Sequence, residues 1–223
     1  MLLLGFDTAT PAVTVALHDG KQVLAQFAAV DAHRHAELLA PAIAKVTADA
    51  GAERGDLTGI AVGVGPGPYT GLRVGVVTAR VLAEALGIPA HGVCTLDVIA
   101  AGAAAAAPGG RDFLVATDAR RREVYWARYD GTGRRQAGPG VGRSAQLGDR
   151  DIPVAGEGAR LYPDLLPAAR EPVYPAAGDL CAIVAAALAG GPAARAGLLP
   201  AEPLYLRRPD AREPGAPKRV SPS

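Results

Sequence analysis

The chain has 223 residues, 49% of them hydrophobic, and a formal net charge of +1 at pH 7. This length fits one large domain or two small ones, and the charge gives no overall attraction to nucleic acid or to membranes. The two cysteines, Cys94 and Cys181, lie in apolar stretches, which favours a reducing compartment. The first residues, MLLLGFDTAT, include no basic leader and only a short apolar run, so we expect a cytoplasmic protein without a signal peptide or membrane segment.

Three β-prone runs open the chain. Leu2–Phe6 is apolar and leads into Asp7, and Val13–Leu17 alternates as a half-buried strand does. Asp19-Gly20 is a hairpin signal, and Val23–Phe27 supplies the third run. The sequence therefore predicts three strands connected in succession.

A first helix is predicted over about residues 36–50. Apolar residues recur there at helical spacing, and Gly51 follows as a stop signal. Pro41 lies inside this run, so we expect either a kink at the proline or a helix that starts near Leu39.

The segment 60–87 is the centre of the predicted fold. A short apolar strand ends at Gly65-Pro66-Gly67-Pro68, and we expect Thr70 to cap a helix that runs from about Gly71 to Leu86. Gly87 is placed as its C-terminal stop. The helix is apolar nearly all round, which is typical of a helix covered on two sides. One side can cover the sheet, and the other indicates a neighbouring helix or a second protein.

The second part of the chain begins like the first. A strand is predicted at 88–93, and Thr95 is expected to cap a helix that runs to about Ala107. Further strands are predicted over Arg111–Thr117, which reaches Asp118, and over Glu123–Tyr129. Residues 133–150 are weakly patterned. A short strand enters a glycine turn at 154–158, and 180–188 is predicted to be a helix.

This order of elements predicts an α/β fold of the ASKHA class (actin, Hsp70 and sugar kinases), built from two RNase H-like lobes with mixed sheets flanked by helices. We expect an N-terminal lobe over residues 1–108 and a smaller C-terminal lobe over 109–208. The last residues, 209–223, are rich in Pro, Arg and Ser, and we expect them to be disordered.

The nucleotide-binding patterns are incomplete. A P-loop ends in Gly-Lys-Ser/Thr, and no lysine follows the glycines at 63–67. An ASKHA phosphate turn needs a strand-end Asp followed closely by Gly and Thr. Asp7 and Thr8 keep the acid and the hydroxyl, but Ala9 stands where the glycine is wanted, and Asp118 is followed by Ala119 and three arginines. Asp7, Thr8 and Asp118 therefore remain weak nucleotide candidates, and the sequence gives no catalytic residue.

Metal and nucleophile patterns are weaker still. His33 and His35 are two residues apart, so they do not share a helix face, and we expect no metal site from them and Glu37. Cys94 and His91 lie three apart on a predicted strand and point to opposite faces. We expect both cysteines to be structural.

Arginines gather in the middle of the chain, with aromatic residues among them. Tyr125, Trp126 and Tyr129 interleave with the arginines in a way that is typical of nucleic-acid binding, although acidic residues are mixed in. Contact with a nucleic acid and a solvated or partner-binding face both stay open. The arginines are Arg120, Arg121, Arg122, Arg128, Arg134, Arg135, Arg143 and Arg150.

Six collinear motifs resemble one family, TsaB, also called YeaZ. They are FDTAT at 6–10, HAELL at 35–39, GVGPGPYTGLRVG at 63–75, GVCTLD at 92–97, DARRREVYWARY at 118–129 and PLYLR at 203–207. The resemblance covers nearly the whole chain except 133–150 and the tail. It implies a non-catalytic partner of TsaD in the complex that, with the ATPase TsaE, adds threonylcarbamoyl to adenosine 37 of ANN-decoding tRNAs.

The resemblance also implies how the partners meet. TsaD is expected to bind the first two long helices, and a homodimer through the same helices is possible when the chain is alone. ATP is expected to be used by the complex, tRNA to be reached through it, and no cofactor to belong to this chain. The expected interface is His35, Leu38, Leu39, Gly71, Leu72, Gly75, Val76 and Ala79.

A test and two rival functions complete the expectation. Gly71, Gly75 and Ala79 form a smooth ridge four residues apart, so we expect Gly75→Leu to block pairing while leaving the monomer folded. The alternatives are an active ASKHA phosphotransferase or ATPase on a small metabolite, and a metallopeptidase-like protein.

Overall fold

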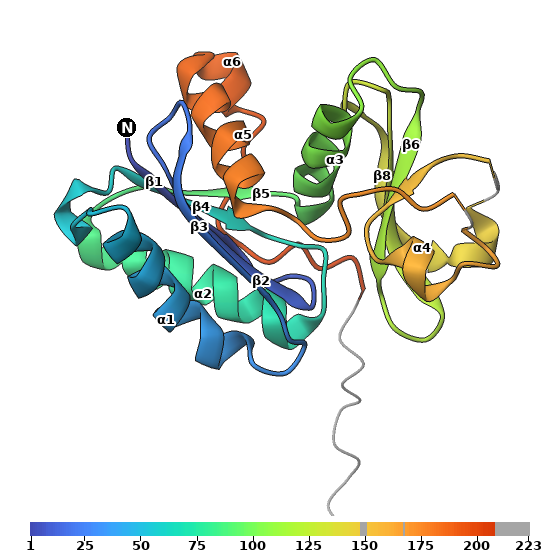
Figure 1. Ribbon diagram of the computed structural model, residues 1–223, viewed down its shortest axis with the longest axis horizontal. Coiled ribbons are helices and arrows are strands. Elements are labelled where there is room, and N and C mark those ends of the chain that lie inside the picture. Colours follow the sequence, from blue (N-terminus) through green and yellow to red (C-terminus); the bar gives the residue numbers. More distant parts are fainter. Residues whose placement is uncertain (148–150, 167, 208–223) are drawn as a thin grey trace, which may run out of the picture.

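A computed structural model describes residues 1–147, 151–166 and 168–207 of the chain. Two β-sheets lie at opposite ends of an elongated molecule, with helices on their faces (Figure 1). Arg150 and the predicted disordered tail at 209–223 lie outside the described residues.

The first sheet has the predicted RNase H-like topology. Its strand order is β3-β2-β1-β4-β5, with β4 and β5 parallel to β1 and with β2 antiparallel to both β1 and β3. Together with the second mixed sheet, this confirms the predicted α/β fold class. The strands are β1 (Leu3–Asp7), β2 (Ala12–His18), β3 (Val23–Val30), β4 (Gly59–Gly63) and β5 (Ala90–Val93).

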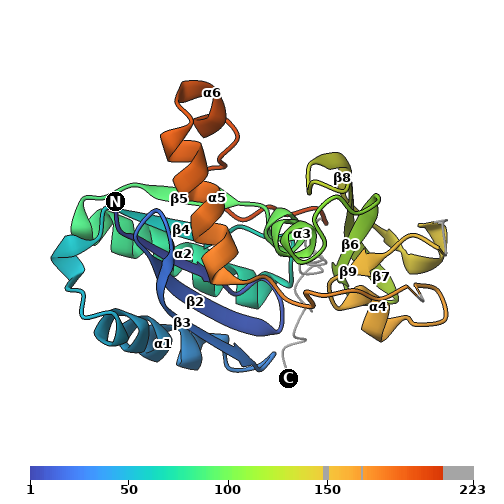
Figure 2. The same cartoon turned by 45° about the horizontal axis from the view of Figure 1, so that its top comes forward.

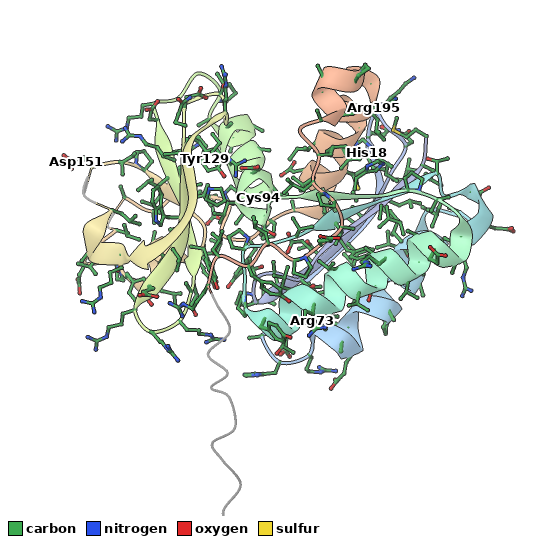
Figure 3. The ribbon with its side chains drawn as sticks, turned by 180° about the vertical axis from the view of Figure 1, so that it is seen from behind. His18, Arg73, Cys94, Tyr129, Asp151 and Arg195 are labelled. Carbon is green, nitrogen blue, oxygen red and sulfur yellow. The ribbon has the colours of Figure 1, made fainter. Side chains whose placement is uncertain are left out.

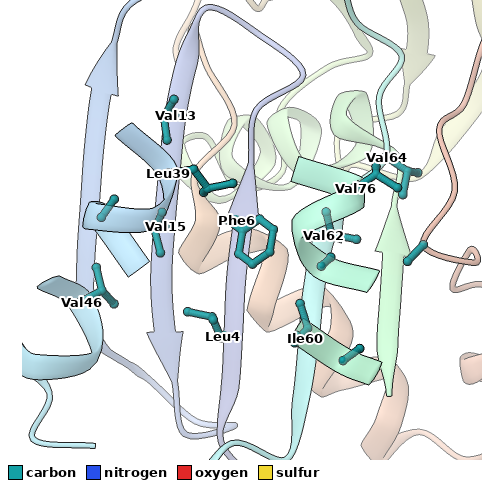
Figure 4. Close-up of a cluster of buried hydrophobic side chains, with 14 of the residues drawn as sticks. Leu4, Phe6, Val13, Val15, Leu39, Val46, Ile60, Val62, Val64 and Val76 are labelled. Atoms are coloured by element: carbon teal, nitrogen blue, oxygen red, sulfur yellow. The ribbon is translucent and has the colours of Figure 1, made fainter. Parts of the chain in front are cut away.

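Helices cover both faces of the first sheet. On one face, α1 (His35–Asp49) and α2 (Tyr69–Leu86) pack over a core that Figure 4 shows in close-up. Phe6 lies at the centre of this core and is fully buried. On the other face lies α5 (Ala177–Ala189), where Cys181 contacts the strand so closely that Gly5 has no room for a Cβ. The expectation of a half-buried β2 is therefore wrong, because all seven of its residues are buried between two helical layers.

The second sheet has the order β8-β7-β6-β9 (Figure 2), and only one of its outer strands was predicted. The strand β8, which runs through the weakly patterned segment, was missed because its Gly- and Pro-rich sequence does not alternate. The elements of this part are β6 (Phe113–Asp118), β7 (Glu123–Tyr129), β8 (Arg135–Arg143), β9 (Val154–Ala155) and the four-residue helix α4 (Gly158–Leu161). Short turns of helix also occur at η1 (Arg54–Asp56), η2 (Ser144–Gln146) and α6 (Pro192–Arg195).

The two halves exchange helices. The helix α3 (Thr95–Ala106) follows the first sheet in sequence, but its Leu96 and Ile99 pack against Phe113 of the second sheet. In return α5, from the predicted C-terminal lobe, completes the core of the first sheet. The boundary predicted at residue 108 stays a prediction, but the segment 177–189 does not lie with 109–176.

Two helix starts differ from their predictions. The helix α2 begins at Tyr69 with Pro68 as its N-cap, so Thr70 lies inside the first turn and does not cap it. Thr95 likewise is the first residue of α3 and does not cap it, because its hydroxyl donates to Asp7. The helix α1 starts at His35 and continues through Pro41, while Gly87 ends α2 in the left-handed conformation, as predicted.

Candidate functional site

The acid at the end of β1 is enclosed by its own chain. Asp7 is completely buried; its Oδ1 accepts a hydrogen bond from the Ala9 amide at 2.7 Å and its Oδ2 accepts one from the Thr95 hydroxyl at 2.7 Å. Burial raises the pKa of the Asp7 carboxyl above its ordinary value, and the two hydrogen bonds oppose that rise. A Cβ on Gly63 would overlap this carboxylate, so the end of β4 packs directly against the acid.

Thr8 joins β1 to α2. Its hydroxyl donates to the carbonyl of Gly71 at 2.7 Å and accepts from the amide of Gly75 at 3.0 Å. In a regular helix these two backbone groups bond each other, so the threonine hydroxyl is inserted between consecutive turns of α2. A Cβ on Gly75 would lie 2.5 Å from the Thr8 hydroxyl. The small-residue ridge therefore faces this strand end, and it is not an outer surface.

This placement corrects the predicted partner interface. The ridge and its apolar neighbours pack in the core of the monomer, because the glycines bring α2 close to β1. Only Leu38 of the predicted set is partly accessible. The residues buried within the monomer are His35, Leu39, Gly71, Leu72, Gly75, Val76 and Ala79.

The outer side of α2 carries the exposed apolar residues instead. Tyr69, Arg73, Val77 and Val81 follow one another at intervals of four, and Val77 and Val81 are 50% and 61% exposed. Tyr69 stacks on Tyr205 with ring centroids 5.6 Å apart. Arg73 lies over the Tyr69 ring at 5.0 Å, on the outside of the helix (Figure 3). We call Tyr69, Arg73, Val77 and Val81, together with Tyr205, the α2 stripe. The four-residue spacing of its α2 members is present in the sequence, but the predicted interface was placed on the glycine ridge.

An apolar groove lies between the C-terminal parts of α1 and α2. Its volume is about 840 Å³, and its lining includes Ile43, Ala44, Leu82, Ala85 and Leu86. The groove and the α2 stripe together leave apolar surface exposed on this side of the first lobe.

The acid at the end of β6 lies in a more open turn. Asp118 Oδ1 accepts a hydrogen bond from the Arg120 amide at 2.8 Å, and Asp118 Oδ2 lies 3.6 Å from the Arg120 guanidinium. Arg120, Arg121 and Arg122 all have φ between 56° and 63°, a left-handed conformation that costs side-chain-bearing residues about 1–2 kcal/mol each. Glu157 accepts from the Asp118 amide at 3.2 Å, and burial raises the pKa of the Glu157 carboxyl.

The two strand-end turns meet at a small pocket of about 260 Å³. Thr8 lines this pocket, but the other two nucleotide candidates, Asp7 and Asp118, do not. Arg120 reaches it from the second lobe. The structure thus brings one of the three candidates to an open site and leaves the strand-end acids outside it.

Most of the aromatic residues among the arginines are buried. Tyr129 is fully buried and donates to Asp97 at 2.7 Å, and Tyr125 is also buried, so two of the three aromatic residues among the arginines cannot stack on bases.

Burial raises the pKa of both cysteine thiols to about 12, and Figure 3 shows Cys94 in the interior. In the part of the chain that the structure describes, no set of three His, Cys, Asp or Glu side chains could hold a metal ion. Over the same residues, every helix is too short or too polar to span a bilayer.

Comparison with known proteins gives consistent results. The family model described as TsaD: tRNA N6-adenosine threonylcarbamoyltransferase matches residues 22–171. A protein of Mycobacterium tuberculosis described as uncharacterized is 46% identical over 220 residues, covering 94% of this chain and 93% of that protein. The tRNA threonylcarbamoyladenosine biosynthesis protein TsaB of Escherichia coli is 38% identical over 129 residues, which is 58% of this chain and 55% of that protein. The structure of YeaZ from Pseudomonas aeruginosa is 31% identical and superimposes with a TM-score of 0.73, covering 92% of this chain and 99% of that chain.

Proposed function

The chain belongs to the TsaB (YeaZ) family, and from this premise we propose that it acts in the biosynthesis of threonylcarbamoyladenosine in tRNA as an accessory subunit without catalysis of its own. Its partner is TsaD, and TsaE and ATP serve the assembled complex. Through that complex the chain contributes to modifying adenosine 37 of ANN-decoding tRNAs. We place this work in the cytoplasm.

The observation that carries the proposal is the α2 stripe beside the apolar groove. Val77 and Val81 expose branched apolar side chains to solvent, and removing apolar surface from water is worth about 25 cal/mol per Å². Tyr69, Tyr205 and Arg73 add residue types that are enriched at the centres of interfaces. We propose that TsaD covers this surface, and that two copies of the chain pair through it when TsaD is absent.

The absence of catalysis is supported by the two strand-end acids. Asp7 is buried with both oxygens hydrogen-bonded inside the protein, so it has no free position for a metal–phosphate complex. Asp118 holds the turn of Arg120 and pairs with its side chain. An ATPase or phosphotransferase needs acids that reach its substrate.

The test measures binding of TsaD from the same organism and modification of tRNA by the reconstituted complex. We expect Val77→Glu and Val81→Glu to weaken TsaD binding by at least tenfold, because each places a charge in an apolar contact, and to reduce modification in parallel. The monomer should remain folded, since both side chains are exposed.

Leu161→Glu is the matched control. Leu161 is 49% exposed on α4 of the second lobe, so the same change is made at similar exposure but away from the α2 stripe. Normal TsaD binding by both valine variants would overturn the proposed surface. Modification by TsaD and TsaE that proceeds equally well without this chain would overturn the accessory role.

A further inference from the structure

A further cavity lies at the edge of the first sheet where its parallel strands begin. Thr58 and Pro89 in its lining directly precede β4 and β5, and Leu188 comes from the C-terminal end of α5. Its volume of about 640 Å³ falls in the range of about 300–1,000 Å³ typical of small-molecule sites. This cavity is therefore separate from the strand-end turns, which lie at the opposite edge of the same sheet.

His91 lines the cavity from β5. It is the register partner of Ala61 on β4, and Ala61 packs in the cluster beneath α5. Partners in neighbouring strands point to the same face of a sheet, so His91 points to the α5 face. Val77 and Val81, which carry the proposed function, lie on α2 across the sheet. A ligand beside His91 is thus independent of TsaD binding.

The Nε2 atom of His91 is buried and has no hydrogen-bond partner among the described residues. The hydroxyls of Thr14 and Thr117 share this condition, but neither residue lines the cavity. Burial and the nearby charge of Arg195 lower the pKa of the His91 imidazole, so the ring is neutral at pH 7 and has one proton to donate. A buried polar atom left unpaired at a cavity wall indicates a bonding group from outside the chain.

Arg195 brings a positive charge without a counterion. It lies on α6, beyond the end of α5 (Figure 3), and its Nε and Nη2 donate to the carbonyl of Leu188 at 3.3 and 2.9 Å. Among the described residues, no carboxylate lies within ion-pair distance of Arg195, and no acidic residue lines the cavity. The guanidinium is therefore positioned by α5 while its Nη1 stays available to an anion.

The remaining lining is mostly apolar. The Thr58 hydroxyl is occupied, because it accepts from the Leu2 amide at 2.8 Å and donates to the Leu2 carbonyl at 3.1 Å. Leu199 is fixed by two backbone hydrogen bonds with Gly92, at 2.8 and 2.9 Å, so this wall is part of the sheet edge. The apolar side chains of the wall include Pro89, Leu188, Leu198 and Leu199.

We propose that this cavity binds a small monocarboxylic acid with an apolar body. The carboxylate would accept hydrogen bonds from Arg195 Nη1 and from His91 Nε2–H, and the body would lie against the leucines. A single negative charge matches the single cation, whereas a phosphate dianion would keep an uncompensated charge beside apolar walls. The Thr58 hydroxyl is occupied and no set of metal ligands is present among the described residues, so the proposal is binding and not a reaction.

The test titrates the full chain by calorimetry with octanoate and with two partial probes. Octanol has the same apolar body without the charge, and acetate has the same head without the body. We expect saturable binding of octanoate, and binding at least tenfold weaker for each partial probe, because each lacks one of the two recognised parts. Bound octanoate should also shift the NMR signals of the His91 ring nitrogens.

Two variants test the head group. Arg195→Gln should weaken octanoate binding at least tenfold and leave octanol binding within twofold, since only the carboxylate uses the charge. Arg195→Lys should recover most of the loss. His91→Phe keeps a ring of similar shape but removes Nε2, and should weaken octanoate binding about fivefold without affecting octanol.

Arg160→Gln is the matched control. Arg160 lies in α4, which like α6 has four residues, but it belongs to the second lobe and does not line the cavity, so octanoate binding should stay within twofold. Equal weakening by Arg160→Gln and Arg195→Gln, octanol binding as tight as octanoate, or no saturable octanoate binding would each overturn the proposal. If Arg195→Gln also loses octanol, Arg195 shapes the cavity, and unchanged octanoate affinity in His91→Phe would then overturn the assigned head-group site.

Discussion

The turns after β1 and after β6 start alike and end in opposite environments. In each, a strand-end aspartate accepts a hydrogen bond from the amide two residues later, at 2.7 Å for Asp7 and 2.8 Å for Asp118. The first turn is then covered by α2, an 18-residue helix, whereas the corresponding helix in the second lobe, α4, has four residues. The strand-end acid is fully buried in the lobe with the long helix and partly accessible in the lobe with the short one.

The largest effect is expected where α2 touches the first turn. Gly75→Leu should destabilise the chain by more than about 3 kcal/mol, because it overpacks the contact with Thr8 and breaks both of its hydrogen bonds. Urea unfolding measures this, with Gly55→Leu as control, since a Cβ at Gly55 meets nothing within 4 Å. Equal stability of the two variants would show that α2 does not press on β1. This replaces the expectation of a folded Gly75→Leu monomer.

A smaller loss is expected from the hydroxyl on the other side of Asp7. Thr95→Val removes a donor to the buried carboxylate and an acceptor for the Gly65 amide, and should cost about 1–3 kcal/mol. Thr117→Val, one residue before Asp118 on β6, is the comparison in the second lobe. The Thr117 hydroxyl is buried without a partner, so its removal should be neutral or stabilising. A comparable loss in both variants, measured by thermal or urea unfolding, would contradict the contrast between the two turns.

The open turn is expected to carry backbone strain. Arg122→Gly should stabilise the chain by about 1 kcal/mol, because glycine adopts a φ of 63° without steric cost. The same substitution at Arg128, on β7 and without a positive φ, should be destabilising. Urea unfolding of both variants compares them directly, and a loss at Arg122 would show that its side chain matters more than its conformation.

The smallest effect is a change in pH dependence. The pKa of Asp7 is raised by burial, so the folded chain binds this proton more strongly than the unfolded chain, and the contribution of Asp7 to stability falls as pH rises above about 3.8. Asp7→Asn should therefore gain stability relative to wild type between pH 4 and pH 7. Asp130, exposed in the β7–β8 turn, has a pKa lowered by Thr132 and neighbouring amides, and Asp130→Asn should show the opposite slope. Unfolding curves across this pH range decide the signs.

The sequence was informative about elements and their order, and less so about which surface each helix presents. Apolar runs and turn residues predicted β1 to β7 because each forms strong local patterns. The strand β8 was missed because glycines and a proline interrupt it, and its partner β7, not its own propensity, holds it in the sheet. The start of α2 was misplaced because Pro68 serves as the N-cap, a role that Thr70 fits better by residue type.

The burial of most predicted interface residues was missed for a related reason. The helix α2 has two apolar sides. Small residues four apart indicate that another element packs closely on the helix, but they do not identify that element. The neighbour is Thr8, sixty-seven residues before Gly75, and no local pattern connects the two. The pocket between the two strand-end turns could be predicted only in part. Thr8 belongs to a motif that the sequence shows, but Thr70, His35 and Arg120 come together only because of how the two lobes pack.

The exchange of helices between the halves bears on how the chain is made. The strands of the first sheet are complete at Val93, but the helix that covers one of their faces ends only at Ala189. At synthesis rates of about 5–20 residues per second, the ribosome needs roughly 5–20 s to deliver those ninety-six residues. During that interval the nascent sheet exposes Leu3 and Ala61. A chaperone that binds apolar strands during translation could therefore bind this face of the sheet until α5 packs on it.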